Sequence, residues 1–123
     1  MDAGEHADDL KHRTQEFALR IIRLCERLPS RPAARVIGNQ LLRSGTSVGA
    51  NYRAARRARS GPDFVSKIGI VLEEADECVY WLELLCASGI VTQEKFGALM
   101  REAEELAAIF AASRLTALRK RRQ

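Results

Sequence analysis

Apolar residues recur at steps of three and four residues along four successive segments of this chain. The spacing is clearest in residues 62–87 and repeats in residues 9–27, 33–59 and 92–118. An α-helix turns once every 3.6 residues, so this spacing gathers the apolar side chains on one side of each helix. The sequence therefore predicts four amphipathic helices and an all-α fold. The clearest stripe consists of Phe64, Ile68, Val71, Leu72, Ala75, Val79, Leu82 and Leu85.

Proline and glycine mark the breaks between these segments. Pro29 and Pro32 end the first segment, Gly61 and Pro62 separate the second from the third, and Gly89 closes the third. Glycine suits the end of a helix and proline suits its first turn, so the second break is both a stop and a start. Helices joined by only a few residues pack as antiparallel neighbours. We therefore predict an up-down-up-down antiparallel four-helix bundle.

Three glycines, Gly38, Gly45 and Gly49, lie inside the second predicted helix. Each costs a helix interior about 1 kcal/mol relative to alanine, so a continuous helix needs a packing reason to tolerate them. We expect a neighbouring helix to approach closely at this seam.

The length of the chain limits it to one hydrophobic core, because 123 residues is close to the commonest size of a single domain. We predict a disordered or frayed N-terminus at 1–8, the four-helix bundle at 9–118 and a basic C-terminal tail at 119–123. No stretch approaches the roughly 20 apolar residues of a membrane span. The acidic N-terminus also lacks the order of a signal peptide. We therefore predict a cytoplasmic protein without membrane contact.

The titratable residues do not form a recognisable catalytic or metal-binding pattern. No histidine follows position 12, so the Glu-x-x-His pairs of di-iron bundles are absent. Cys25, Cys78 and Cys86 have aliphatic neighbours and no metal-ligand spacing, and we expect buried thiols. No nucleophile, base and orienting group recur together. We predict that the protein is not an enzyme and has no metal, no cofactor and no small-molecule substrate.

Basic residues are concentrated in the second predicted helix. The chain has a formal net charge of +4, but the stretch between Arg27 and Pro62 contains no carboxylate. A guanidinium group can hold phosphate oxygens through two parallel hydrogen bonds and can stack on unpaired bases. Helical spacing places Arg53, Arg56 and Arg57 along one side. We predict nucleic-acid binding, RNA more than DNA, by Arg43, Arg53, Arg56, Arg57 and Arg59.

Two other interpretations of the charge remain open. Residues 73–105 carry nine carboxylates against Lys95 and Arg101. The acidic and basic faces can neutralise one another within a subunit or between subunits, although surface pairs contribute less than about 1 kcal/mol each. Alternatively, the chain is a protein–protein scaffold or adaptor that contacts a partner protein and no nucleic acid. Salt dependence distinguishes these interpretations, since phosphate contacts release counterions.

Two adjacent blocks of sequence resemble one known protein family. The first is Gln40–Tyr52, QLLRSGTSVGANY, and the second runs from Ser60 through Glu74 to Leu85. They are similar to the four-helix-bundle family associated with intervening sequences of bacterial 23S ribosomal RNA genes. The resemblance implies a left-handed bundle that assembles into a ring, a homopentamer. It also implies a relationship to the accessory variability protein of diversity-generating retroelements, which works with RNA and a reverse transcriptase.

The chain departs from the family pattern at Ala54, where glutamate is common. The substitution makes the arginine-rich face more cationic. Within the two blocks, Asn51, Tyr80 and Trp81 are candidates for a subunit interface or a helix seam. A buried asparagine can fix the register of neighbouring helices, and exposed aromatic pairs are typical of interfaces. Ordinary core packing is the alternative for Asn51 and Trp81.

Overall fold

Four α-helices pack against each other in the computed structural model, which describes the backbone of residues 3–121 and the side chains of residues 7–121. The helices are α1 (Ala3–Glu26), α2 (Pro32–Arg56), α3 (Gly61–Ala87) and α4 (Gln93–Arg121). No strand occurs within the described residues. The prediction of an all-α fold built from four helices is confirmed.

The helix ends follow local capping chemistry. Pro32 occupies the first turn of α2, where its missing N–H leaves no hydrogen bond unmade. Ser60 caps α3, because its side-chain oxygen accepts a hydrogen bond of 3.1 Å from the backbone N–H of Asp63. After α3, Gly89 adopts a positive φ of 77°, a conformation that favours glycine. The predicted breaks thus lie where the connections between helices form.

Three helix bounds differ from those predicted. The first helix begins at Ala3 rather than near residue 9, and the fourth continues to Arg121 instead of ending before the tail at 119–123. The second ends at Arg56 rather than Arg59. Apolar periodicity marks the part of a helix that is packed, so polar turns at either end carry no such signal. Residues 1–2 and 122–123 of the predicted termini lie outside the described part of the chain.

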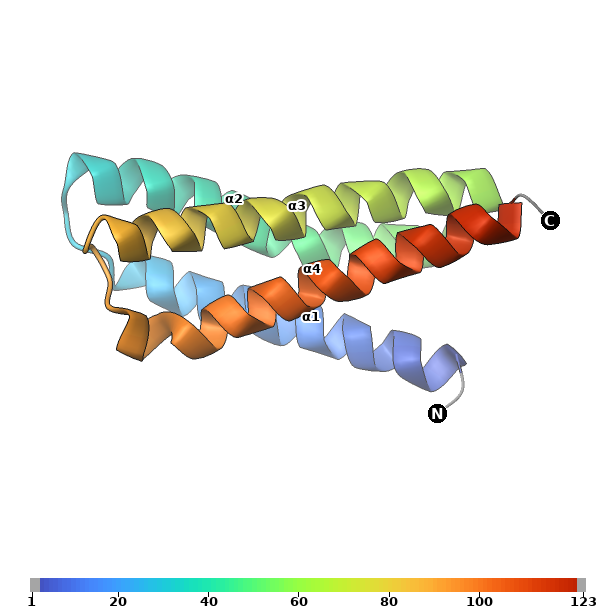
Figure 1. Cartoon of the computed structure of the whole chain (residues 1–123), viewed down its shortest axis with the longest axis horizontal. Coiled ribbons are helices and arrows are strands. Elements are labelled where there is room, and N and C mark those ends of the chain that lie inside the picture. The colour runs from blue at the N-terminus through green and yellow to red at the C-terminus, as the bar shows by residue number, and fades with distance from the viewer. Residues whose placement is uncertain (1–2, 122–123) are drawn as a thin grey trace.

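The core is formed by the predicted apolar stripes. Phe17 and Ile21 of α1, Leu41 of α2, Leu82 of α3 and Phe110 of α4 are all buried. The packing of α1 on α2, of α2 on α3 and of α3 on α4 is extensive, whereas α1 and α4, the fourth pair of helices in contact, touch much less. Figure 1 shows α1 and α4 separating toward the end of the molecule that holds both termini.

Gly45 and Gly49 of α2 lie against α1, whereas Gly38 lies against Leu28 in the connection between the two helices. A Cβ built at Gly45 would come within 2.8 Å of Ile21 Cγ2, and one built at Gly49 within 3.1 Å of Thr14 Oγ1. Distances this short leave no room for a methyl group, so the expected close approach of a neighbouring helix is confirmed. The packing gained at this seam offsets the poor helix propensity of glycine.

None of the helices within residues 3–121 combines the length and the apolar composition that a transmembrane helix requires.

Candidate nucleic-acid interface

Two basic segments that are far apart in the sequence lie at the same end of the molecule (Figure 1). The end of α2 carries Arg53 and Arg56. The end of α4 packs beside the start of α3, and α3 begins only a few residues after α2 ends. Cγ of Arg121 lies 4.0 Å from the position that a Cβ at Gly61 would occupy. We call this region the basic end. It comprises Arg53, Arg56, Arg57, Arg59, Arg119, Lys120 and Arg121.

A shallow hollow of about 320 Å³ at the basic end brings three of the predicted arginines together. It is lined by Arg53 and Arg56 of α2, by Arg57 directly after that helix, and by Asp8 and Lys11 of α1. Arg56 Nη1 forms an ion pair of 2.9 Å with the Asp8 carboxylate. Arg53 and Arg57 are exposed and make no ion pair with any carboxylate among the described side chains. Within the described side chains, these two guanidinium groups are thus available to an external anion.

Arg59 lies in the connection beyond α2, not on the helix. Its backbone N–H donates a 3.1 Å hydrogen bond to Asp63 Oδ2, which also accepts a 2.8 Å bond from Lys67 Nζ. The pKa of Asp63 is lower than its ordinary value. The hydrogen bond from Lys67 is the largest cause, and the hydrogen bond from the Arg59 backbone is the second. The Arg59 residue itself is exposed. The backbone of the connection is therefore held in place, while the side chain of Arg59 faces solvent.

Arg43 lies apart from the other predicted arginines. It precedes Arg53 by ten residues, which corresponds to about 15 Å along a helix. Its guanidinium group contacts two carboxylates of α3, with Nη1 3.1 Å from Glu74 and Nη2 2.5 Å from Glu77. The hydrogen bond with Glu74 is the main cause that raises the pKa of Arg43. The structure does not bring Arg43 together with the basic end.

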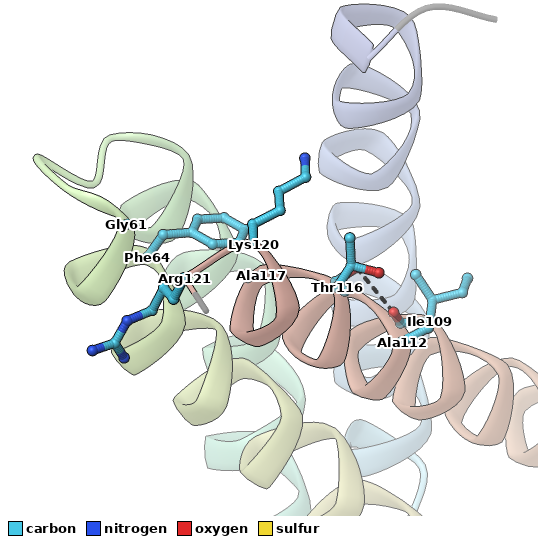
Figure 2. A pocket seen from close by; sticks show the side chains of 9 residues that line it. Gly61, Phe64, Ile109, Ala112, Thr116, Ala117, Lys120 and Arg121 are labelled. Atoms are coloured by element: carbon cyan, nitrogen blue, oxygen red, sulfur yellow. Dashed lines mark hydrogen bonds between the residues drawn. The ribbon is translucent and has the colours of Figure 1, made fainter. Parts of the chain in front are cut away.

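An apolar pocket of about 810 Å³ lies next to the basic end, between α3 and α4. Phe64 of α3 and Ile109, Ala112 and Ala117 of α4 line it, with Thr116 and Ser113 as polar neighbours. Figure 2 shows Lys120 and Arg121 extending from the last turn of α4 beside the pocket. Sequence reasoning did not find these two residues as site residues. The run of basic residues after 118 is the available signal, but the sequence pattern predicts only a basic C-terminal tail there.

The predicted interface residues have different environments. Tyr80 is 52% exposed, whereas Trp81 is half-buried against the core. Their rings meet edge to face, with centroids 5.0 Å apart. The Trp81 indole N–H is buried and has no hydrogen-bond partner among the described residues. Asn51 Nδ2 donates a 2.9 Å bond to the Ser47 carbonyl oxygen within α2, so its amide group makes no bond across helices in the described contacts.

The cysteine thiols lie in apolar surroundings. Burial raises the pKa of Cys25 to about 11 and that of Cys78 to about 12. The Cys78 thiol also contacts the buried Ser44 hydroxyl at 3.5 Å. All three cysteines are free thiols. Among the described residues, no three histidine, cysteine, aspartate or glutamate side chains are grouped to hold a metal ion.

The fold and the site define a class: an all-helical domain of four packed helices with arginines gathered at one end. The chain belongs to the family of 23S rRNA-intervening sequence proteins, whose family model matches residues 9–112. The resemblance inferred from the two sequence blocks is thereby confirmed.

A solved structure supports the same assignment. A protein of unknown function from the S23 ribosomal protein family of Bacteroides thetaiotaomicron VPI-5482 is 37% identical to this chain, with a TM-score of 0.80. The match covers 88% of this chain and 96% of that one. A comparison with curated proteins finds no significant match.

Proposed function

We propose that this protein is a non-catalytic accessory protein of the cytoplasm that binds nucleic acid, RNA more than DNA, through its basic end. One observation carries the proposal. Arg53 and Arg57 form no ion pair with a carboxylate among the described side chains, and they line the same hollow as Arg56. The end of α4 adds Lys120 and Arg121 at the same end of the molecule. Membership of a family linked to 23S rRNA intervening sequences supports RNA as the partner.

The chemistry of the basic end suits phosphate better than base recognition. Arginine forks bind phosphate oxygens with two hydrogen bonds and stay charged at every physiological pH. No aromatic side chain is present among the described residues that line the hollow. Contacts of this kind follow backbone and shape more than sequence. We expect binding of structured RNA with little dependence on base sequence.

A protein–protein scaffold is the second candidate. Apolar side chains are exposed away from the basic end, with Val36 at 63%, Ile70 at 41% and Tyr80 at 52% exposure. Exposed apolar and aromatic residues favour contacts with protein. We propose that such contacts include other copies of this chain, in an up-down-up-down bundle that assembles into a ring of five, with Trp81 and Tyr80 near the subunit interface. Sedimentation tests this part, because a monomer at micromolar concentration contradicts it.

Salt-dependent RNA binding tests the main proposal. A labelled structured RNA is titrated with wild type and with the double variant Arg53→Gln/Arg57→Gln at several salt concentrations. Each lost phosphate contact reduces the slope of log affinity against log salt by about 0.7 to 0.9. We expect the double variant to bind more weakly and to flatten the slope by roughly 1.4 to 1.8.

The control is Arg31→Gln/Arg35→Gln. It removes the same charge from exposed positions near the other end of α2. If both variants lose affinity equally, the effect is one of net charge and the basic end is not the binding surface. If the folded wild type binds no RNA at low salt, the nucleic-acid proposal is wrong and the scaffold is favoured.

A further inference from the structure

Four cations converge on a cleft between α1 and α4 at the end of the molecule opposite to the basic end. Arg20, Arg23 and Arg27 come from α1, and Lys95 comes from α4. Two adjoining cavities of about 200 and 450 Å³ form this cleft and share Arg27, Lys95, Leu24 and Phe96 among their lining residues. Leu24 and Leu99 are buried and form the apolar floor.

Among the described residues, no carboxylate lines this cleft beside its four cations. Further along the same pair of helices, Arg13 of α1 meets Glu102 of α4 at 2.7 Å and Glu105 at 3.2 Å. In the cleft, by contrast, none of the four cations forms an ion pair within the described side chains. The neighbouring Glu26 and Glu94 are exposed and pair with none of them. Like charges held close together repel unless an anion lies between them.

Phe96 gives the cleft an aromatic wall. It is half-buried, packs against the core and lines both cavities. An aromatic ring beside cationic groups matches a ligand that has both a flat π-system and a negative charge, since bases stack on aromatic side chains and phosphates bind guanidinium groups. The larger cavity also has the size of a small-molecule site, for which volumes of about 300 to 1,000 Å³ are usual.

We propose that this cleft binds a nucleotide, with its phosphate held by Arg20, Arg23, Arg27 and Lys95 and its base against Phe96. The nucleotide is either free or one unit of a nucleic-acid strand. The site shares no residue with the basic end, so the proposal stands independently of the RNA binding proposed above.

Calorimetric titration at low salt tests the cleft with three probes: AMP, ribose 5-phosphate and a short oligoadenylate. The test variant is Arg23→Gln/Arg27→Gln, and the control Arg31→Gln/Arg35→Gln removes the same charge near the same end without touching the cleft lining. We expect the test variant to weaken binding roughly tenfold or more, because hydrogen bonds to charged groups are lost. We expect the control to keep wild-type affinity.

The variant Phe96→Leu distinguishes the contribution of the base to binding from that of the phosphate. It preserves an apolar side chain, and we expect it to weaken binding of AMP while leaving that of ribose 5-phosphate unchanged. Tighter binding of AMP than of oligoadenylate identifies a free nucleotide as the ligand, and the reverse order identifies a strand. If no probe binds saturably, or if test and control variants lose affinity equally, the proposal is overturned. Thermal unfolding of each variant confirms that the compared proteins are folded.

Discussion

Ile21 of α1 lies so close over Gly45 of α2 that a Cβ built at Gly45 would stand 2.8 Å from Ile21 Cγ2. Both residues are buried, and Ile21 is completely shielded from solvent. The contact sets how closely α1 approaches α2, because the branched side chain fills the space that a side chain at position 45 would need. This seam in turn fixes the position of Asp8 and Arg56 at the basic end, since the two helices carry them.

Gly45→Ala tests the seam. Overpacking costs typically about 1 to 3 kcal/mol, whereas replacing glycine by alanine in a helix gains about 1 kcal/mol. We expect the free energy of unfolding to fall by about 1 kcal/mol in urea titrations. Gly69→Ala is the control, because a Cβ there meets Arg114 Nε at an ordinary 3.5 Å, and we expect it to stabilise the protein by about 0.5 to 1 kcal/mol. Stabilisation by both variants would contradict the close packing.

Cys78 should resist alkylation in the folded protein. With a pKa of about 12, only about one thiol in ten thousand is ionised at pH 8, and the thiolate is the reactive form. We expect iodoacetamide to leave Cys78 unmodified in the native state at pH 8 and to modify it readily in urea. Mass spectrometry of peptides locates the label. Modification of Cys78 at the same rate with and without urea would show that it is not buried.

Removing the carboxylate of Asp8 should strengthen RNA binding. Asp8 neutralises Arg56 through the 2.9 Å ion pair at the edge of the hollow, so Asp8→Asn frees a third guanidinium group for phosphate. We expect higher affinity and a steeper salt dependence, with the slope increased by about 0.7 to 0.9. Asp9→Asn makes the same change of charge at an exposed neighbour that forms no ion pair with the described side chains. Equal gains from both variants would mean that net charge alone is responsible.

Asp63 should make the stability of the protein depend on pH in the acid range. Its pKa is lower in the folded state than its ordinary value, chiefly because Lys67 donates a hydrogen bond to it. The stabilisation is therefore present at pH values above the unfolded pKa of about 3.9 and is lost as the pH falls through the folded pKa. We expect wild type to unfold at higher urea concentration than Asp63→Asn at pH 5 to 7, and this difference to shrink at pH 3.

Asp76→Asn is the control for this pH series. Asp76 is exposed on α3 and forms no ion pair with the described side chains. A difference between wild type and Asp63→Asn that stays constant from pH 7 to pH 3 would show that the ion pair with Lys67 contributes nothing.

The fold was largely predictable because its causes are local. The stripe that includes Ile68 and Leu82 is buried as predicted, since a spacing of three and four residues can satisfy burial only on one side of a helix. The start of α3 at Gly61 and Pro62 depends on the preference of proline for the first turn of a helix and on the cap that Ser60 provides. The bounds were less predictable, because exposed polar turns such as the last turn of α4 leave no apolar pattern.

The candidate site was predictable only in part. Arg53, Arg56 and Arg57 share a side because they are close in sequence, and they line one hollow. Whether an arginine is free for a ligand depends instead on residues far along the chain. Arg43 meets Glu74, 31 residues away, and Arg56 meets Asp8, 48 residues away. No pattern within one helix reveals such pairs.

The sequence by itself determined the four helices, the sides that they bury and the family to which the chain belongs, because periodicity, capping and motif spacing act over a few residues. The tertiary structure alone decided which charges meet. It placed the end of α4 at the same end of the molecule as the end of α2 (Figure 1), and it brought Arg20, Arg23, Arg27 and Lys95 to one cleft that no carboxylate lines among the described residues. Coulomb interactions depend on distance in space, and in a bundle that distance follows from how the helices pack against one another.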